Sequence, residues 1–499
     1  MTRAATPARA ARFAIAAGAV ALGSASVARA ATLQAGPGKT YPTPCMAIAA
    51  ARAGDEIDVA PGTYTDTCEI ATAGLTLKGV GGQPKIDLSG TNHPADYKGI
   101  YVVSADNVTI ENLELTGAHV DDSEGGNAAG LRVTGHGLTV HGCNIHDNQN
   151  GILAAPTVDG GTITIEYTEL SHNGLGDACD QGGCVHNVYV SKTSSAIRYD
   201  KTVFQFNWSH DLASDTANKG HLFKSRSRET DVLYNRITGE AGHDSYEVDL
   251  PNGGVGIVVG NVIEKGKNPD NSILLDFGEE GLDNPDKSLY VVGNTFVNDF
   301  TASTFIEVAS GATLTAHDNV FSGPGTPSST GALSADNLSG VDPLFVDPTT
   351  YVYHLQATSP AIGKAIAAGA AGAFSLTPAF EYVHPLASVV RATEHDLGAF
   401  EYGTKLGGAN SGAEAGAGAS ADAGAGAGAG ADAGAGAGAD ADAGAGDAST
   451  GGTRASDGGG CGCRVVGSVA GARVGALGLV GVALLLLRRW RRAPGAQRR

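Results

Sequence analysis

Short runs of apolar and β-branched residues, separated by Gly, Asn and Asp, recur along most of the chain. Between about Ala31 and Gly403 one local pattern of six residues repeats. It begins with an apolar residue, has a characteristic fourth position, which we call the fixed position, and ends with a second apolar residue. The fixed positions fall at residues 113, 143, 168, 207, 235, 261, 294 and 319, with spacings of 30, 25, 39, 28, 26, 33 and 25 residues. A repeat of this length made of short strands is typical of a solenoid.

The repeat predicts an all-β fold, a right-handed parallel β-helix. In such a solenoid the strands of successive coils stack at about 4.8 Å, and their side chains alternate between the interior and the outer surface. Five fixed positions are asparagines, and we expect an inward ladder whose amides bond to turn backbone. Its members are Asn207, Asn235, Asn261, Asn294 and Asn319. A β-sandwich or barrel is the alternative architecture.

Both ends of the repeat resemble the ends of secreted pectate-lyase-like β-helix proteins. At the N-terminal end the resemblance rests on GPGKTYPTPCMAIAAARAGDEIDVAPGTY, and it implies a capping helix near Pro44–Arg52 and a first strand after Gly54-Asp55. At the other end VDPLFVDPTTYVYHLQATSPAIGKA and HDLGAFEYG resemble the last coil of the same proteins. The resemblance spans roughly residues 31–403, the predicted β-helix domain, and it implies a fold rather than a reaction.

Charge divides the chain into an acidic body and two basic ends. The whole chain has 33 Lys and Arg against 52 Asp and Glu, a net charge of −19. Residues 1–30 hold four arginines and residues 461–499 hold eight, with no acid in either segment, which leaves a body of net charge −31. So acidic a body excludes non-specific binding to nucleic acid. The 73 glycines and 6% aromatic residues also argue against a Leu-rich helical bundle.

The N-terminus predicts a secretory signal peptide over residues 1–30. Three arginines precede a short apolar run over residues 13–22, and Ala28-Arg29-Ala30 supplies a small-x-small cleavage site. The run has roughly ten residues and is too short to span a bilayer, although a membrane anchor is the alternative. We therefore expect the protein to be exported.

The C-terminal region predicts a tether followed by a membrane segment. Residues 404–460 are almost only Gly, Ala, Ser and Asp, which predicts a disordered linker. Residues 465–487 are apolar apart from Arg473 and end in an arginine cluster, as in a transmembrane helix whose C-terminus stays inside. Together with Cys461-Gly462-Cys463, the segment 461–499 resembles the MYXO-CTERM type of sorting signal. That resemblance implies display at the outer cell surface, with processing near the Cys pair; a plain single-pass anchor is the alternative.

Cysteine usage predicts two disulfides in the body. Pairing of Cys45 with Cys68 would tie the cap helix to the first coil, and pairing of Cys179 with Cys184 would close a small loop. Cys143 falls on the inward ladder, so we expect a buried, unpaired thiol. The sequence has no C-x-x-C metal spacing, and we predict no metal ligand set or other cofactor. Calcium is compatible with Asp-rich loops, but no loop spacing is diagnostic of it.

Polar residues interrupt the repeat in four successive coils between residues 179 and 281. Strand alternation places Tyr189, Lys224, Asp249 and Asp276 on one outward column, because the apolar residues beside them point inward. We predict catalytic roles for these four residues. Six residues beside the column are predicted to bind substrate: His186, Asn187, His221, Arg226, Glu247 and Glu279. An ordinary solvated surface is the alternative interpretation of these charges.

The segment HLFKSRSRETDVLYNRI, followed by GNVIEKG, resembles the Lys-Ser coil of the polysaccharide lyase family that includes chondroitinase B and alginate lyases. The resemblance implies that Lys224 takes the C5 proton of a uronate, helped by an arginine on the following coil and by calcium. This chain has Asp249 where that arginine would stand, and acidic neighbours are expected to raise the pKa of Lys224. The other candidate chemistry is hydrolysis by Asp249 and Asp276 as a carboxylate pair.

The sequence thus predicts a cell-surface protein, expected to be a monomer, that acts on a polysaccharide as a lyase or a hydrolase. Its partners would be that polysaccharide and, through the C-terminal helix, the membrane, with no nucleic acid. Two alternatives remain open. One is a carbohydrate-binding or adhesive protein that uses the same surface without turnover, and the other is a structural spacer.

Overall fold

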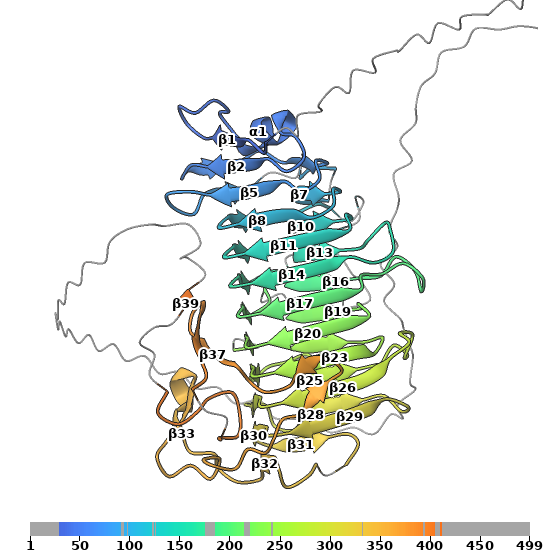
Figure 1. Ribbon diagram of the computed structural model, residues 1–499, viewed down its shortest axis with the longest axis vertical. Helices are drawn as coiled ribbons and strands as arrows, with labels where there is room; N and C mark the ends of the chain where they lie inside the picture. The colour runs from blue at the N-terminus through green and yellow to red at the C-terminus, as the bar shows by residue number, and fades with distance from the viewer. Residues whose placement is uncertain are drawn as a thin grey trace, which may run out of the picture. The chain divides into compact units, whose positions relative to one another are not determined.

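The computed structural model describes residues 29–90, 94–96, 98–121, 124, 126–174, 185–213, 220–240, 243–331, 333–392, 395–404 and 410–411. Within these residues three parallel sheets run along the domain, and each coil adds one short strand to each sheet in turn (Figure 1). Sheet A has 11 strands from β1 (Thr32–Ala35) to β29 (Thr313–His317), and sheet B has 11 from β3 (Thr63–Tyr64) to β32 (Leu338–Ser339). Sheet C has 10 strands from β4 (Cys68–Ile70) to β31 (Gly325–Ser328). This is a parallel β-helix, consistent with the predicted right-handed solenoid.

The N-terminal end of the β-helix is closed by the helix α1 (Pro44–Ala50). Ala47 and Ile48 of α1 are buried in the same apolar cluster as β1 and β2 (Glu56–Val59), so the helix covers the interior that would otherwise open to water. A disulfide joins Cys45 in α1 to Cys68 in β4, across a separation of 23 residues. The capping helix and this disulfide are both as expected from the sequence.

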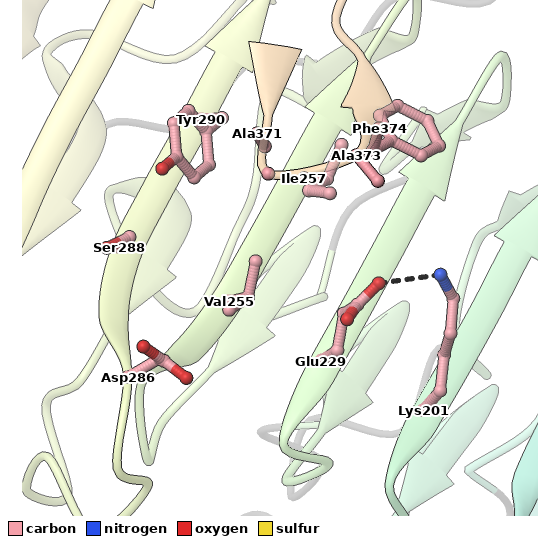
Figure 2. Close-up of a pocket in the computed structure, with 11 residues that line it drawn as sticks. Lys201, Glu229, Val255, Ile257, Asp286, Ser288, Tyr290, Ala371, Ala373 and Phe374 are labelled. Atoms are coloured by element: carbon pink, nitrogen blue, oxygen red, sulfur yellow. Dashed lines mark hydrogen bonds and ion pairs between the residues drawn. The ribbon is translucent and has the colours of Figure 1, made fainter.

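The chain beyond β32 forms antiparallel pairs on the outside of the β-helix instead of a last coil. The pairs are β33 (Phe345–Asp347) with β34 (Val352–Leu355), β35 (Ala370–Ala371) with β36 (Phe374–Ser375), and β37 (Phe380–Val383) with β38 (Ala387–Val390). Phe345, Tyr353 and Leu355 pack against sheet B, and Ala371 and Leu376 pack against sheet A. Figure 2 shows the hairpin β35–β36 in front of the sheet A strands. The predicted last coil is therefore wrong, because the apolar residues of this segment cover the outer faces of earlier coils.

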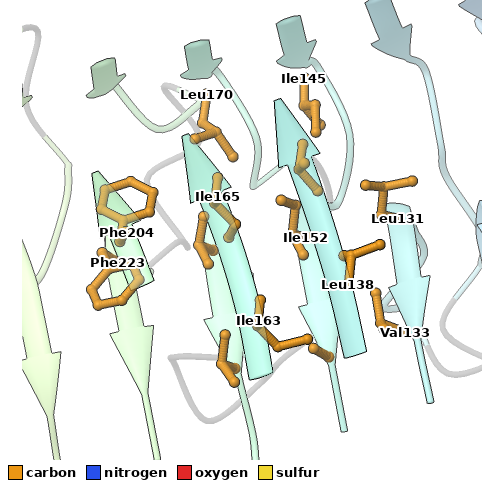
Figure 3. Close-up of a cluster of buried hydrophobic side chains, with 14 of the residues drawn as sticks. Leu131, Val133, Leu138, Ile145, Ile152, Ile163, Ile165, Leu170, Phe204 and Phe223 are labelled. Carbon is orange, nitrogen blue, oxygen red and sulfur yellow. The ribbon is translucent and has the colours of Figure 1, made fainter. Parts of the chain in front are cut away.

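The interior of the β-helix is a narrow column of Val, Ile, Leu and Phe side chains (Figure 3). The alternation of side chains along each strand produces this column. In β14 (Thr162–Glu166), for example, Ile163 and Ile165 are fully buried, and the residues between and beside them face outward. Phe204 stacks on Phe223 with 4.5 Å between ring centroids. Full burial of one such side chain contributes about 1.5–3 kcal/mol, and the repetition in every coil stabilises the stack.

The predicted asparagine ladder is present at the turn between sheets A and B. Each amide donates to the backbone of the preceding coil and to the next asparagine; Asn261 Nδ2, for example, donates to Val232 O at 2.8 Å and to Asn294 Oδ1 at 2.9 Å. The ladder continues past Asn319 to Asn337. Cys143 occupies an equivalent position as a buried free thiol, and burial raises its pKa to about 12.

Several predicted features lie outside the described residues. They are residues 1–28 of the signal peptide, the pair Cys179 and Cys184, most of the linker, and the segment 461–499 with its predicted transmembrane helix. Among the residues that the structure does describe, none of the helices has the length and apolar character needed to cross a bilayer.

Candidate functional site

Sheet C carries a column of polar side chains on its outer face. In this column Tyr189 pairs in register with Lys224, Lys224 with Asp249, and Asp249 with Asp276. The apolar residues beside them belong to the hydrophobic core, so the four polar side chains point away from it. The register predicted from strand alternation is therefore confirmed. The four strands are β16 (Val188–Val190), β19 (Phe223–Ser225), β22 (Val248–Leu250) and β25 (Ile273–Phe277).

The column is a packed polar network and not a solvated surface. Lys224 is 4% exposed, Asp249 0% and Asp276 1%. The turn after β25 supplies a further carboxylate, since Glu280 Oε1 lies 3.0 Å from Lys224 Nζ. The interpretation of these charges as ordinary solvated surface is therefore excluded.

Lys224 is held in its charged form by the carboxylates around it. Its Nζ lies 2.7 Å from Asp249 Oδ2 in the next coil. Burial alone would lower the pKa of Lys224, but the negative charges of Asp249 and Glu280 outweigh burial, and the net shift is upward. The lysine therefore keeps its proton at neutral pH and is poorly suited to accept another.

Three aromatic rings pack against one another at a tilt beside the column, each contributed by one coil: His186, His221 and Tyr246. Successive ring centroids are 4.9 Å apart. The backbone N–H of Tyr246 donates to Nδ1 of His221 at 3.2 Å, and burial together with the charge of Lys224 lowers the pKa of His221 well below its usual value. His221 is therefore neutral with its proton on Nε2, which faces Asp249 Oδ2 at 3.3 Å.

Arg226 connects the column to the turns that cover it. Its Nε donates to the hydroxyl of Tyr189 at 2.8 Å, and its two terminal nitrogens donate to Asn252 Oδ1 at 2.8 Å and to Glu280 Oε1 at 2.7 Å. The guanidinium also lies over the ring of Tyr189, 5.6 Å from its centroid. With three hydrogen bonds and a ring contact, Arg226 fixes the position of Glu280 above Lys224.

Asp249 and Asp276 lie side by side, and the pKa of each carboxyl is raised. Burial raises the pKa of Asp249 to about 6, because it outweighs the opposing charge of Lys224. Burial also raises the pKa of Asp276, and the negative charges of Asp249 and Glu279 raise it further, to well above its usual value. The negative charge of Asp249 raises the pKa of Asp276 in addition to burial, whereas Lys224 at 2.7 Å favours the ionised form of Asp249, so Asp276 is the member of the pair better placed to hold a proton.

Asp249, Asp276 and Glu279 are also the residues that could hold a metal ion. One carboxylate oxygen from each lies within 4.8 Å of the others. Oxygen ligands of this kind suit Ca²⁺. The same carboxylates are already partly satisfied within the protein, because Glu279 N–H donates to Asp276 Oδ2 at 3.3 Å and Tyr246 donates to Glu279 Oε2 at 2.5 Å.

Asn187 does not face the column, which corrects its predicted role in substrate binding. Its side chain is fully buried and its Nδ2 donates to the backbone oxygens of Leu170 and His210, both at 3.0 Å. Together with Asn148 and Asn173 it forms a second inward ladder, at the turn between sheets B and C. Asn187 precedes the first residue of β16, so the alternation of the strand does not apply to it.

Glu247 likewise lies outside the column, contrary to the prediction. It is fully buried, with Oε1 2.8 Å from Lys265 Nζ, and Lys265 also contacts Asp244 Oδ2 at 3.1 Å. Burial raises the pKa of Glu247 well above its usual value, and Lys265 only partly offsets this. These three buried groups form a structural ion cluster that is separate from Lys224.

Glu280, Asn252 and Tyr246 were not among the predicted site residues. Glu280 and Asn252 lie in turns that follow strands of sheet C, where no periodicity assigns a direction to a side chain. Tyr246 lies two residues before β22, outside the alternation of the strand, and its ring packs at a tilt against His221 with centroids 4.9 Å apart. The one available signal was composition, since GEEG and PNGG place polar residues directly after two of the four strands.

Comparison with known proteins gives similarity to solved structures only. No protein-family model matches the chain, and no curated protein matches it. A pectate lyase, Pel9A, is 16% identical with a TM-score of 0.48, covering 75% of this chain and 96% of its own. A rhamnogalacturonan lyase is 12% identical with a TM-score of 0.43, covering 63% and 90%. Pectin methylesterase PemA from Erwinia chrysanthemi is 15% identical with a TM-score of 0.32, covering 63% and 93%.

Proposed function

We propose that the chain is an exported enzyme that hydrolyses glycosidic bonds of a polysaccharide at the sheet C column. The supporting observation is the pair Asp249 and Asp276, which lie in register one coil apart, with Lys224 Nζ 2.7 Å from Asp249 Oδ2. Glycoside hydrolysis needs one carboxylic acid and one carboxylate on either side of the scissile bond. In the proposed site Asp276 supplies the first and Asp249 the second.

In this mechanism Asp276 gives its proton to the leaving-group oxygen while Asp249 attacks the anomeric carbon. The bond from that carbon to the leaving oxygen breaks as the bond to Asp249 forms. Asp276 then takes a proton from the water that hydrolyses the glycosyl ester, which restores both groups. Carboxyl oxygens of the pair lie within 4.8 Å of each other. That separation is nearer the roughly 5–5.5 Å of retaining enzymes than the roughly 6.5–9.5 Å of inverting ones.

Lys224 and the N–H of His221 favour the ionised form of Asp249. Lys224 contacts it at 2.7 Å, and the neutral ring of His221 faces the same oxygen at 3.3 Å. A lyase mechanism would instead need Lys224 as an unprotonated base, and its raised pKa opposes that role. The charge distribution therefore supports hydrolysis over elimination.

The exposed turn after β25 is the side from which a sugar would reach the pair. Glu279 is the exposed member of the carboxylate cluster, whereas Asp249 and Asp276 are buried behind it. Export and display at the cell surface are proposed from the sequence of residues 1–30 and 461–499. Protease treatment of intact cells tests that location, since a surface protein is digested without lysis.

The activity is tested with the full chain and a panel of polysaccharides, with separate assays for new reducing ends and for unsaturated ends. We expect reducing ends without unsaturation, and a loss of roughly 10²–10⁴-fold in D249N and D276N. Glu307 continues the same column one coil beyond Asp276, so E307Q is the matched control and should keep full activity. Unsaturated products, or full activity in D249N, would contradict the assignment.

Non-catalytic carbohydrate binding is the second candidate, because the burial of the column disfavours its direct participation in a reaction. Tyr189, Lys224, Asp249 and Asp276 are each covered almost completely, which is common for a structural network. If the protein is retained on a polysaccharide but releases no product from any member of the panel, binding without turnover is the function.

A further inference from the structure

A cavity of about 580 Å³ lies on the outer face of sheet A, a different sheet from the one that carries the column. It crosses four neighbouring strands, and the hairpin β35–β36 forms one wall (Figure 2). We call it the sheet A groove. Cavities of this volume are typical of sites for small molecules. The four strands are β17 (Lys201–Gln205), β20 (Glu229–Leu233), β23 (Gly254–Val259) and β26 (Lys287–Val292).

The wall formed by the hairpin is fixed by apolar packing. Ala371 and Leu376, in and beside the hairpin, belong to one buried cluster with Ile257 and Val292 of sheet A. The floor of the groove is also rigid, because its strands are paired in continuous register from Lys201 to Ser288. The groove is therefore formed before any ligand binds, which reduces the entropy cost of binding.

Two aromatic rings, from Tyr290 in β26 and Phe374 in β36, line the groove (Figure 2). Both are half-buried, so part of each ring remains open to a ligand. Ser288 and the hydroxyl of Tyr290 provide polar groups beside the rings. Apolar ring faces next to a few hydrogen-bonding groups match the two kinds of surface that a sugar ring presents.

The charges that line the groove disfavour an anionic ligand. Lys201 Nζ lies 2.6 Å from Glu229 and 2.6 Å from Asp231, so its positive charge is already compensated. Asp286 adds another exposed carboxylate to the lining. The groove therefore carries a net negative charge, which repels uronates and offers acceptors to hydroxyl groups.

Asp231 in β20 is a buried carboxylate beside the groove. It pairs in register with Ile257, which lines the groove, and both lie on the outer face of sheet A. Asp231 is 2% exposed, and within the described part of the chain its Oδ1 has no hydrogen-bond partner. Asp231 is not among the residues that line the groove, and it contributes to the site by compensating the charge of Lys201 at 2.6 Å.

We propose that the sheet A groove is a binding site for a neutral oligosaccharide or a neutral stretch of a longer glycan. The site does not depend on whether the sheet C column is catalytic. The groove would be an attachment point for the glycan chain, separate from the sheet C column. If the column is catalytic, the groove would hold the chain on one side of the β-helix while the column acts on it from another side.

The proposal is tested by isothermal titration of the full chain with cellohexaose, xylohexaose, mannohexaose, maltohexaose and hexagalacturonate. We expect at least one neutral oligosaccharide to bind and hexagalacturonate not to bind. Y290A removes an aromatic ring that would stack on the sugar, so it should weaken binding about ten-fold. S288W, which fills the groove and keeps both rings, should do the same if Y290A proves unstable. The matched control is Y402A, which removes a ring that is 49% exposed and lies outside the groove.

The outcomes separate this proposal from the catalytic one. Binding that is lost in Y290A and S288W but retained in D249N supports the groove, whatever the activity of the protein. Absence of binding to every neutral oligosaccharide overturns the groove, even if polysaccharide is cleaved. Preference for hexagalacturonate, or equal loss of binding in Y402A, also overturns it.

Discussion

Lys224 Nζ and Asp249 Oδ2 lie 2.7 Å apart and join two successive coils of sheet C. Both side chains are removed from water, with Lys224 4% exposed and Asp249 0%. An intact buried ion pair adds little net stability, because desolvation offsets most of the attraction. Removal of one partner is costly, because the other is left as a buried charge without compensation.

The pair should therefore behave as a coupled unit in unfolding experiments. We expect K224M to lower the free energy of unfolding by about 3–5 kcal/mol, and the double variant K224M/D249N to lose much less than the sum of the two single losses. Chemical denaturation of the four proteins in the cycle measures the coupling. The control is K78M, which breaks the more exposed 2.9 Å pair with Glu111 and should cost about 1 kcal/mol or less. Additive losses in the sheet C cycle would contradict a coupled pair.

Hydrolysis should depend on pH through the same aspartate. The proposed mechanism needs Asp249 ionised, and burial raises its pKa to about 6, so kcat/KM should fall as the pH drops below about 6. Activity should also fall at high pH, where Asp276 loses the proton that it must donate. Replacing Lys224 by Met removes a charge that favours ionised Asp249, so the acid limb should move to higher pH. K224R keeps that charge, so the acid limb of its profile of kcat/KM against pH should stay where it is in the wild type. An acid limb that does not move in K224M would contradict the role of Asp249.

Strand alternation predicted the part of the site that lies within strands. Tyr189, Lys224, Asp249 and Asp276 lie inside short parallel strands, where a period of two residues fixes the direction of each side chain. Their register followed from the repeat length, because each coil returns the chain to the same sheet. The repeat also predicted the asparagine ladder, because every ladder position follows a strand of sheet A at a constant distance in the sequence.

The rest of the site could not be predicted because it depends on turns. Asn187 stands one residue before its strand, and its amide turns inward to satisfy backbone carbonyls. Glu280 reaches Lys224 from a turn 56 residues further along the chain, and no local pattern encodes that contact. The sheet A groove needs the hairpin β35–β36, whose position is set by packing on Ile257 and Val292, in strands far earlier in the chain.

Glu264 should make the stability of the protein sensitive to pH. Burial raises its pKa from 4.5 to about 8, although Tyr353 donates to its Oε2 at 2.7 Å. Between these values the folded protein keeps a proton that the unfolded chain releases, so stability should fall as pH rises from about 4.5 to 8. A shift of this size corresponds to roughly 4–5 kcal/mol. E264Q has no charge to bury, so it should match the wild type at about pH 5 and exceed its stability at about pH 9.

Denaturation of both proteins at the two pH values measures this difference. E307Q replaces a half-buried glutamate of sheet C and controls for the general loss of a negative charge. A wild-type protein that gains stability relative to E264Q as the pH rises would contradict the shift. Other buried carboxyl groups titrate in both proteins and cancel in the comparison.

Asn261 should be among the most costly residues to replace in the ladder. Its Nδ2 donates to Val232 O, Val259 O and Asn294 Oδ1, and its Oδ1 accepts from the backbone and side chain of Asn235. N261L would fit an apolar side chain into the column but leave those backbone groups without partners. Each unsatisfied buried group costs about 1–3 kcal/mol, so we expect a loss of at least about 3 kcal/mol in the free energy of unfolding.

The end of the ladder provides the comparison that separates hydrogen bonding from packing. Asn337 is half-buried and has no further asparagine to bond within the described residues, so water can satisfy the groups that N337L exposes. N207T tests the opposite case, because Thr168 occupies the ladder position one coil earlier and shows that a hydroxyl fits there. We expect N337L and N207T to lose clearly less stability than N261L. If N261L and N337L are equally destabilised, the interior ladder bonds do not stabilise the β-helix more than its exposed end.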